Sequence, residues 1–217
     1  MKPEAGKVAR VLKVLDVRYP GKGMMDFGNP EDTLIATLLS ARTTDVQVLR
    51  VYPALRKRYP TLKALAKADV REMGTIIKSI GFYNAKARSV KKLANVLLDE
   101  FGGRVPRTME ELVRLPGVGR KTASCVLTYA FKIPAIAVDT HVFRIVHRLG
   151  WAKGKNAVEV EKELRTLIPE KYWIGVNRSL VQFGRDVCRA PKPQCWRCPV
   201  AKWCAYPNKT VSSSHDR

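Results

Sequence analysis

The stretch LPGVGRKTA, from Leu115 to Ala123, decides the fold. Apolar residues recur at helical spacing up to Leu115, and a second helical pattern starts at Lys121. Only Pro116 to Arg120 lie between the two patterns, and two of these five residues are glycines. Such a short, glycine-containing connection between two helices predicts a helix–hairpin–helix.

A hairpin of this kind suits a phosphate group. Glycines can adopt positive φ and leave backbone N–H groups uncovered, and the N-terminus of the second helix favours an anion. We therefore predict DNA phosphate contacts at Gly117, Val118, Gly119 and Arg120. The alternative is a tight turn without a ligand, and the overall charge of the chain favours the phosphate.

That charge is strongly positive. The 217 residues include 40 Lys and Arg but only 19 Asp and Glu, which gives a formal net charge of +21. Neutralising DNA phosphates releases condensed counterions, so nucleic acid is the expected partner. A hydrophobic content of 46% is normal for a folded protein, and no apolar run is long enough to span a membrane. We expect a monomer without a targeting signal, located in the cytoplasm.

Helical periodicity continues through the whole chain, so an all-α fold of roughly ten helices is expected. No segment alternates like a strand. The patterns that predict helices cover Val8–Leu15, Thr33–Leu39, Val46–Leu55, Val70–Ile80, Ala87–Phe101, Met109–Leu115, Val142–Leu149 and Val158–Leu167.

Two polar residues near the hairpin are candidates for catalysis. Lys121 lies in the first turn of the second hairpin helix, where it could contact a phosphate or act as a nucleophile. A lysine with an ordinary pKa near 10.4 is only about 0.04% neutral at pH 7, so a nucleophilic role requires surroundings that disfavour the ammonium form. Asp139, in AVDTH, is expected to cap the next helix; alternatively, its carboxylate could move a proton or stabilise a developing cation.

Four cysteines near the C-terminus predict a metal centre. They follow the pattern C-x6-C-x2-C-x5-C within seventeen residues. Disulfides are rare in intracellular proteins, whereas four thiolates suit either a tetrahedral zinc ion or a four-iron cluster. The ligands of this predicted centre are Cys188, Cys195, Cys198 and Cys204.

Taken together, these motifs resemble endonuclease III, a bifunctional DNA glycosylase of the helix–hairpin–helix superfamily. LLSARTTD, IGFYNAKA, GGRVP and FGRDVC extend the resemblance from about residue 25 to about residue 205. It implies a two-lobed fold with a cleft between the lobes. One lobe is a helical barrel of residues 25–134 that ends in the hairpin helix. The other comprises residues 1–24 and 135–217 and carries a [4Fe-4S] cluster on the four cysteines.

The resemblance also implies an activity in base-excision DNA repair. The substrate is double-stranded DNA with a damaged base, especially an oxidised pyrimidine such as thymine glycol, or with an abasic site. Lys121 attacks C1′ of a flipped-out nucleotide, Asp139 faces it and assists, and β-elimination cuts the strand. The cluster is structural, and Arg189 and Lys192 in its loop meet phosphates.

The chain departs from the family pattern at two positions. Arg42 replaces the usual Gln that fills the space left by the flipped base, and Phe82 replaces the usual Leu that forms a wedge between bases. Arginine is a good donor to guanine acceptors, so an altered preference for the opposite base is expected. His141 is a further candidate DNA contact.

Two alternative functions remain open from the sequence. One is a mismatch glycosylase of the same superfamily, acting on thymine, uracil or adenine, although such enzymes typically lack a lysine at the position of Lys121. The other is a non-catalytic DNA-binding module held together by zinc.

Overall fold

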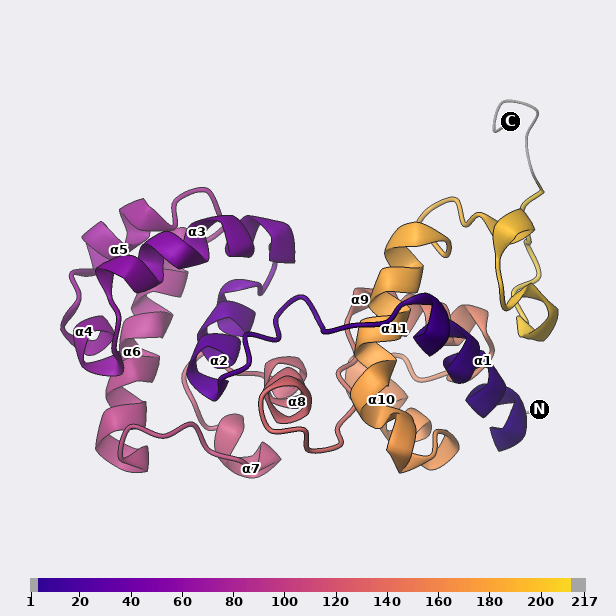
Figure 1. Ribbon diagram of the computed structural model, residues 1–217, viewed down its shortest axis with the longest axis horizontal. Helices are drawn as coiled ribbons and strands as arrows, with labels where there is room; N and C mark the ends of the chain where they lie inside the picture. The colour runs from indigo at the N-terminus through magenta and orange to yellow at the C-terminus, as the bar shows by residue number, and fades with distance from the viewer. Residues whose placement is uncertain (1–3, 212–217) are drawn as a thin grey trace. The chain divides into compact units, whose positions relative to one another are not determined.

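The computed structural model describes residues 4–211 and is helical throughout this range, without a strand (Figure 1). The predicted all-α fold is thus confirmed. Contacts between Cα atoms divide the chain into two compact units, Met24–Ile133 and a second unit formed by Met1–Gly23 with Pro134–Arg217.

The unit Met24–Ile133 is built around α6. Helices α4 and α5 pack against α6, and α2 packs against α8. Its helices are α2 (Pro30–Leu39), α3 (Asp45–Arg58), α4 (Leu62–Lys67), α5 (Val70–Ile76), α6 (Tyr83–Phe101), α7 (Met109–Leu112) and α8 (Arg120–Tyr129).

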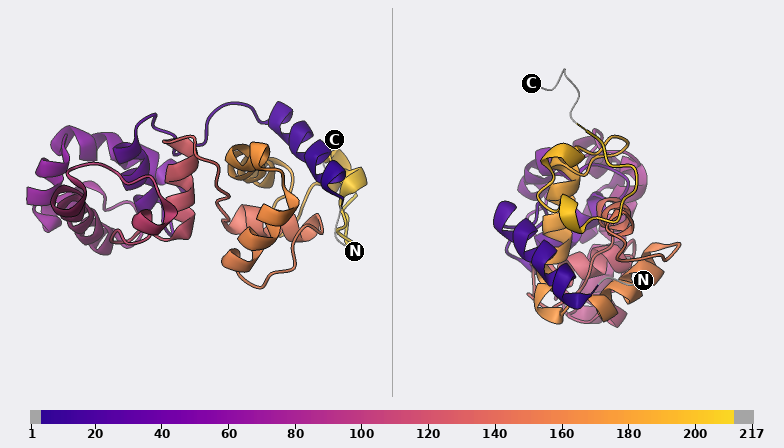
Figure 2. Two further views of the ribbon diagram at one scale, coloured as in Figure 1. Left: turned by 90° about the horizontal axis from the view of Figure 1, so that it is seen from below. Right: turned by 90° about the vertical axis from the view of Figure 1, so that its right-hand side faces the viewer.

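The second unit combines the two ends of the chain. Helix α1 packs against α11, which also packs against α9 (Figures 1 and 2). Its helices are α1 (Ala5–Arg18), α9 (Thr140–Arg148), α10 (Ala157–Leu167) and α11 (Trp173–Asp186), with short 3-10 turns at Glu170–Tyr172, Cys195–Arg197 and Ala201–Trp203. The shared core is fully buried and includes Val8, Leu15, Ile145, Leu180 and Phe183.

Side chains close the N-terminal ends of many helices, which explains why the helices begin where they do. Each of these caps accepts a hydrogen bond from a backbone N–H of the first turn and satisfies a donor that the helix itself leaves unpaired. The capping residues are Asn29, Thr44, Thr61, Asp69, Thr108, Asp139 and Asn156.

Two helices end earlier than the sequence pattern predicts. Helix α5 ends at Ile76 instead of Ile80, and α7 ends at Leu112 instead of Leu115. The apolar residues beyond each end are nevertheless buried, with Ile80 1% and Leu115 2% exposed. At these positions the apolar pattern continues because the residues of the following turn are buried, although the helix has ended.

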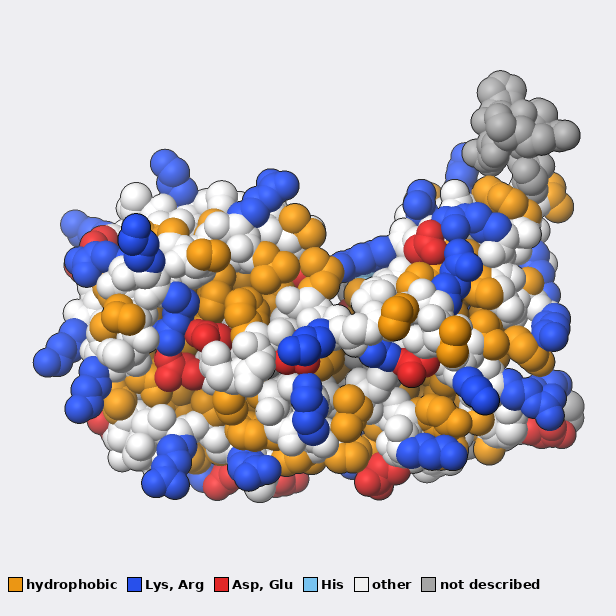
Figure 3. All heavy atoms as spheres, in the orientation of Figure 1, with side chains coloured by type: hydrophobic (Ala, Val, Ile, Leu, Met, Phe, Trp, Pro, Cys, Tyr) orange, Lys and Arg blue, Asp and Glu red, His pale blue; other side chains and the backbone are white. Residues whose placement is uncertain are grey.

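Basic side chains are spread over the surfaces of both units. On the face drawn in Figure 3, Lys and Arg outnumber Asp and Glu and form no single block. None of the helices within residues 4–211 is long and apolar enough to cross a membrane.

Candidate active site and metal centre

The hairpin glycines have different structural roles. Gly117 has a φ of +78°, and a Cβ built on it would lie 3.2 Å from Leu38 and 3.4 Å from Ser89. Gly119, the N-cap of α8, has an ordinary φ of −94°, and a Cβ there would meet nothing within 4 Å. Gly117 is therefore required by the fold, whereas the open space at Gly119 leaves the start of α8 accessible to a ligand.

Lys121 is the second residue of α8 and is partly buried. The eight residues that follow it, from Thr122 to Tyr129, are all buried. A helix enclosed in this way is rigidly held, so the backbone of Lys121 is fixed while its side chain lies at the exposed end of the helix. Arg120, directly before it, is exposed.

Asp139 caps α9, as predicted. Its Oδ1 accepts a hydrogen bond of 2.8 Å from the backbone N–H of Val142. The preceding residues, 135–138, are buried and hold the backbone in place. A carboxylate has about four acceptor positions, so this single capping bond leaves it able to accept further hydrogen bonds. Lys121 and Asp139 belong to different units, each held by the packing of its own unit.

Arg42 and Phe82 lie side by side at the tips of two loops. Both have left-handed backbones, with φ of 56° and 58°, and the Arg42 guanidinium carbon lies 4.6 Å from the centre of the Phe82 ring. Phe82 is 59% exposed, although it is large and apolar. The two side chains are thus in direct contact.

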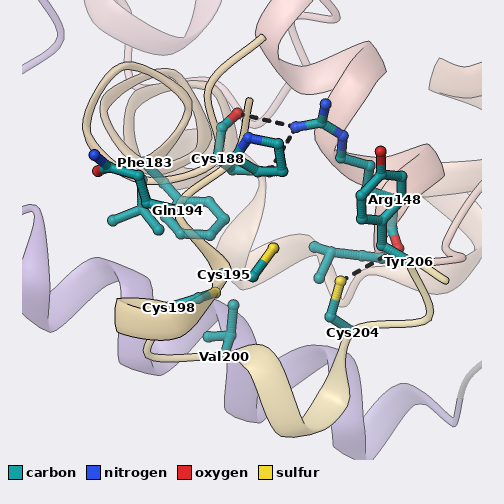
Figure 4. Close-up of a pocket in the computed structure, with 12 residues that line it drawn as sticks. Arg148, Phe183, Cys188, Gln194, Cys195, Cys198, Val200, Cys204 and Tyr206 are labelled. Atoms are coloured by element: carbon teal, nitrogen blue, oxygen red, sulfur yellow. Dashed lines mark hydrogen bonds between the residues drawn. The ribbon is translucent and has the colours of Figure 1, made fainter. Parts of the chain in front are cut away.

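The four predicted metal ligands line a single cavity (Figure 4). The cavity is partly open to solvent, and its volume of about 20 Å³ slightly exceeds the roughly 10–15 Å³ that one water molecule needs. Apolar residues, among them Phe183 and Val200, complete its wall. Within residues 4–211, no group of three or more His, Cys, Asp or Glu residues is arranged to bind a single metal ion.

The cysteines are only partly exposed, and this affects their chemistry. Burial raises the pKa of Cys198 to about 11 and also raises the pKa of Cys204. The thiols of Cys198 and Cys204 are therefore protonated at neutral pH, and Cys204 donates a hydrogen bond to the backbone oxygen of Arg148 at 3.4 Å. Binding of a metal would displace these protons.

Two arginines of α9, which the sequence did not single out, hold the first cysteine. Arg144 donates to the backbone oxygen of Cys188 at 3.0 Å. Arg148 donates to the Cys188 sulfur at 3.4 Å and stacks on Tyr206, with 4.9 Å between the guanidinium carbon and the ring centre. The only sequence signal was their spacing of four residues in a helix, which does not reveal what they face.

The cysteine loop is also fixed to the end of α11. Arg197 donates to Asp186 Oδ1 at 2.6 Å, and Tyr19 of the segment after α1 donates to Asp186 Oδ2 at 2.7 Å. Both hydrogen bonds lower the pKa of Asp186, and the one from Tyr19 has the larger effect. Both ends of the chain are thereby tied to the same carboxylate.

Two predicted DNA contacts, Arg189 and Lys192, lie in this loop, and a third, His141, lies in α9. Arg189 is exposed, and its Nε donates to the backbone oxygens of Arg185 and Asp186 at 3.0 Å each. Lys192 is exposed as well. His141 is partly buried, with Nδ1 3.2 Å from an Arg144 nitrogen.

Comparisons with known proteins identify the family to which this chain belongs. The profile of the "HhH-GPD superfamily base excision DNA repair protein" family matches residues 35–170. Endonuclease III of Synechocystis is 42% identical over 200 residues, 91% of each chain. Endonuclease III of Escherichia coli K12 is 42% identical over 188 residues, which cover 85% of this chain and 88% of that protein.

Solved structures show the same fold. A trapped covalent endonuclease III–DNA intermediate with an estranged adenine superposes with a TM-score of 0.87 at 39% identity, covering 94% of this chain and 96% of that one. A thermostable thymine-DNA glycosylase gives 0.83 at 29% identity, covering 94% and 95%. The chain belongs to the HhH-GPD superfamily of base excision DNA repair proteins and, within it, to the endonuclease III family of DNA glycosylases that also cleave abasic sites.

Proposed function

We propose that this enzyme removes oxidised pyrimidines, such as thymine glycol, from duplex DNA, with Lys121 as the nucleophile. The observation that carries this proposal is the position of Lys121 at the start of the buried helix α8, directly after the open turn at Gly119. A phosphate held by the backbone N–H groups of that turn would bring the sugar of an adjacent nucleotide near the lysine amine.

The chemistry begins with a nucleotide flipped out of the duplex, because C1′ cannot be reached in the stack. The Lys121 amine forms a bond to C1′ while the bond from C1′ to the base breaks, and the departing base takes up a proton. The sugar ring opens to a Schiff base between lysine and C1′. Loss of a proton from C2′ then breaks the C3′–O bond, which cuts the strand 3′ to the abasic site.

Asp139 has the role of stabilising charge in this proposal. Positive charge develops on the sugar as the base leaves, and a nearby carboxylate lowers the energy of that state. It can also accept a proton from the attacking amine. Its capping bond to the N–H of Val142 supports this role because it keeps the carboxylate in one orientation.

A [4Fe-4S] cluster suits the donor set of Cys188, Cys195, Cys198 and Cys204, four thiols that line one cavity. Four thiolates suit either zinc or a four-iron cluster, and membership of the endonuclease III family favours the cluster. When bound, the cluster supplies four iron–thiolate bonds that tie the loop together. The loop itself presents Arg189 and Lys192 to DNA phosphates.

The remaining DNA contacts are proposed at the hairpin and on the two loop tips. Gly117, Val118, Gly119 and Arg120 would bind one phosphate through the backbone. Arg42 and Phe82 would enter the space left by the flipped nucleotide, and His141 would add a further contact. We propose that the protein acts as a monomer on chromosomal DNA in the cytoplasm.

Borohydride trapping tests the nucleophile. The cluster-loaded protein is mixed with duplex DNA that carries an abasic site or thymine glycol, and borohydride reduces any Schiff base to a stable amine. The wild type should give a covalent protein–DNA band, and Lys121→Ala should give none. Lys92→Ala, which removes an exposed lysine of α6, serves as the matched control and should be trapped like the wild type.

Two results would contradict the proposal. A trapped band of full intensity with Lys121→Ala would assign the Schiff base to another amine. Removal of a base without any trapped band in the wild type would indicate a monofunctional mismatch-type glycosylase, with Lys121 limited to binding phosphate.

A further inference from the structure

The chain passes from one unit to the other twice, and an ion pair joins these two connections. The unit boundaries fall at Gly23–Met24 and at Ile133–Pro134. Asp26 follows the first boundary and Lys132 precedes the second, so both residues belong to the same unit. The Lys132 Nζ donates to Asp26 Oδ2 at 3.0 Å, although the two residues are 106 positions apart in the sequence. On the side of this unit, the two connections are therefore held together.

The backbone of Lys132 is unusual for a residue with a side chain. Its φ is +57°, in the left-handed region that glycine often occupies after the end of a helix. A residue with a Cβ is strained there, and such strain persists where the surrounding structure requires it. The Nζ of Lys132 also donates to the backbone oxygen of Tyr129, the last residue of α8, at 2.6 Å. The lysine side chain thus connects the end of α8 to Asp26, a contact that glycine cannot provide.

The carboxylate of Asp26 depends on this partner. Its side chain is only 4% exposed, whereas that of Lys132 is 62% exposed. Oδ1 of Asp26 accepts a hydrogen bond of 3.1 Å from the backbone N–H of Gly28, and Oδ2 accepts the bond from Lys132. A buried carboxylate that loses its cation is an uncompensated charge, so this pair contributes more than an ion pair between two exposed side chains.

Two neighbouring residues of α11 hold the same connections on the side of the other unit. Asn177 is 7% exposed, and its Nδ2 donates to the backbone oxygen of Ala137 at 2.9 Å. Arg178 donates to the backbone oxygen of Gly21. Each connection is therefore held at both ends, and the segments between the anchors are short. These segments are residues 22–25 and 133–136.

We propose that the Asp26–Lys132 pair makes the two connections act as one stiff support. The pair thereby holds Lys121, at the start of α8, in place relative to Asp139, which follows the second connection. Two connections that are joined must move together, whereas separate ones can each rotate about their own bonds. The inference rests on the proposed function, in which the lysine amine and the carboxylate act on one nucleotide. In that reaction Asp26 and Lys132 are positioning residues.

Hydrogen exchange followed by mass spectrometry tests the coupling without DNA and without catalysis. In Lys132→Met, the amides of residues 22–25 and of residues 133–136 should exchange several-fold faster than in the wild type. Lys132→Gly relieves the backbone strain but removes the amine, so it should show the same faster exchange in residues 22–25. Lys132→Arg keeps the charge and should exchange like the wild type. Lys63→Met, at an exposed position of α4, is the matched control and should change neither segment.

Single-turnover excision of thymine glycol at saturating enzyme measures the positioning. The rate constant should fall roughly tenfold in Lys132→Met and in Asp26→Asn, because small misplacements of reacting groups slow a reaction strongly. The double variant should be no slower than the slower single variant, since both remove the same interaction. Affinity for a duplex with tetrahydrofuran, an abasic analogue, should stay within about threefold of the wild type, because the phosphate contacts of each unit are intact.

Three results would overturn the inference. Faster exchange confined to residues 133–136 would show that Lys132 stabilises only the end of its own helix. A wild-type exchange pattern in Lys132→Gly would assign the position to backbone conformation instead of the ion pair. An unchanged excision rate in Lys132→Met, despite faster exchange in both segments, would exclude the positioning role. If the wild type excised no base while exchange responded as expected, the proposed function would fail and the coupling of the two connections would stand.

Discussion

Lys86 is buried without a partner for its charge. The residue is 6% exposed in α6, and its Nζ has no hydrogen-bond partner in the described part of the chain. Burial lowers the pKa of this amine, because the charged form loses its hydration. A buried polar group without a hydrogen bond costs about 1–3 kcal/mol of stability. We therefore predict that Lys86→Met, which keeps the length of the side chain, raises the melting temperature at pH 7.

The increase in melting temperature that we expect for Lys86→Met should depend on pH. Between the lowered pKa of Lys86 and the ordinary value of 10.5, the folded protein binds fewer protons at this residue than the unfolded chain does. The stability of the wild type therefore rises with pH between these two values. The penalty is complete below the lowered pKa and fades as the pH approaches the ordinary value of 10.5. Thermal unfolding at neutral and alkaline pH measures this difference. Lys92→Met, at an exposed position of the same helix, should show no such gain. A lower melting temperature for Lys86→Met than for Lys92→Met would show that the amine contributes a favourable interaction.

The sequence revealed residues whose role depends on their neighbours in the chain, and it missed residues whose role depends on packing between helices. Asp139 was recognised as a helix cap because a cap depends on its neighbours in the chain. Lys86 and Arg148 were missed because burial and the direction of a side chain are consequences of packing between helices. The same limit applied to Arg42 and Phe82. Each was singled out, but their stacking joins two loops 40 residues apart in the sequence.

At the scale of the hairpin, substitutions of the two glycines distinguish effects on folding from effects on DNA binding. An alanine at Gly119 has an allowed φ and open space, so Gly119→Ala should leave the melting temperature within a few degrees of the wild type. Its methyl group would occupy the approach to the N-terminus of α8, and affinity for abasic DNA should fall by roughly tenfold, about 1.4 kcal/mol. Gly117→Ala should lower the melting temperature, because its φ of +78° is strained for alanine.

Thermal unfolding and DNA titration of both variants provide the measurement, and each variant is the control for the other. Unchanged affinity in a stable Gly119→Ala would show that the hairpin turn does not approach the phosphate.

Among the elements, helix ends were harder to predict than helices, as α5 and α7 illustrate. Ile77 and Ile80 continue the apolar period beyond α5 because they are buried in the following turn, and periodicity cannot distinguish these two situations.

At the scale of the whole molecule, the unit that carries the cysteines is formed from both ends of the chain. The four cysteines lie in the last part of the sequence, yet the wall of their cavity includes Phe183, which packs in the same core as Val8 and Leu15 of α1. Sequence patterns could predict each helix of this core, but not that residues at opposite ends of the chain share it. We propose that the two units fold around separate cores and that only one of them supports the cluster.

Two matched cavity mutations test that division. Leu15 in α1 and Leu97 in α6 are both completely buried, and neither is near a cysteine in the sequence. Replacing a buried leucine by alanine costs about 2–5 kcal/mol. Leu15→Ala should loosen the core behind the cysteine cavity, so the visible absorption of the cluster should disappear several-fold faster on warming than in the wild type. Leu97→Ala destabilises the other core to a similar extent but should leave the rate of cluster loss close to the wild-type rate at temperatures below unfolding. Equal acceleration by both variants would contradict separate cores and would mean that the two units unfold as one.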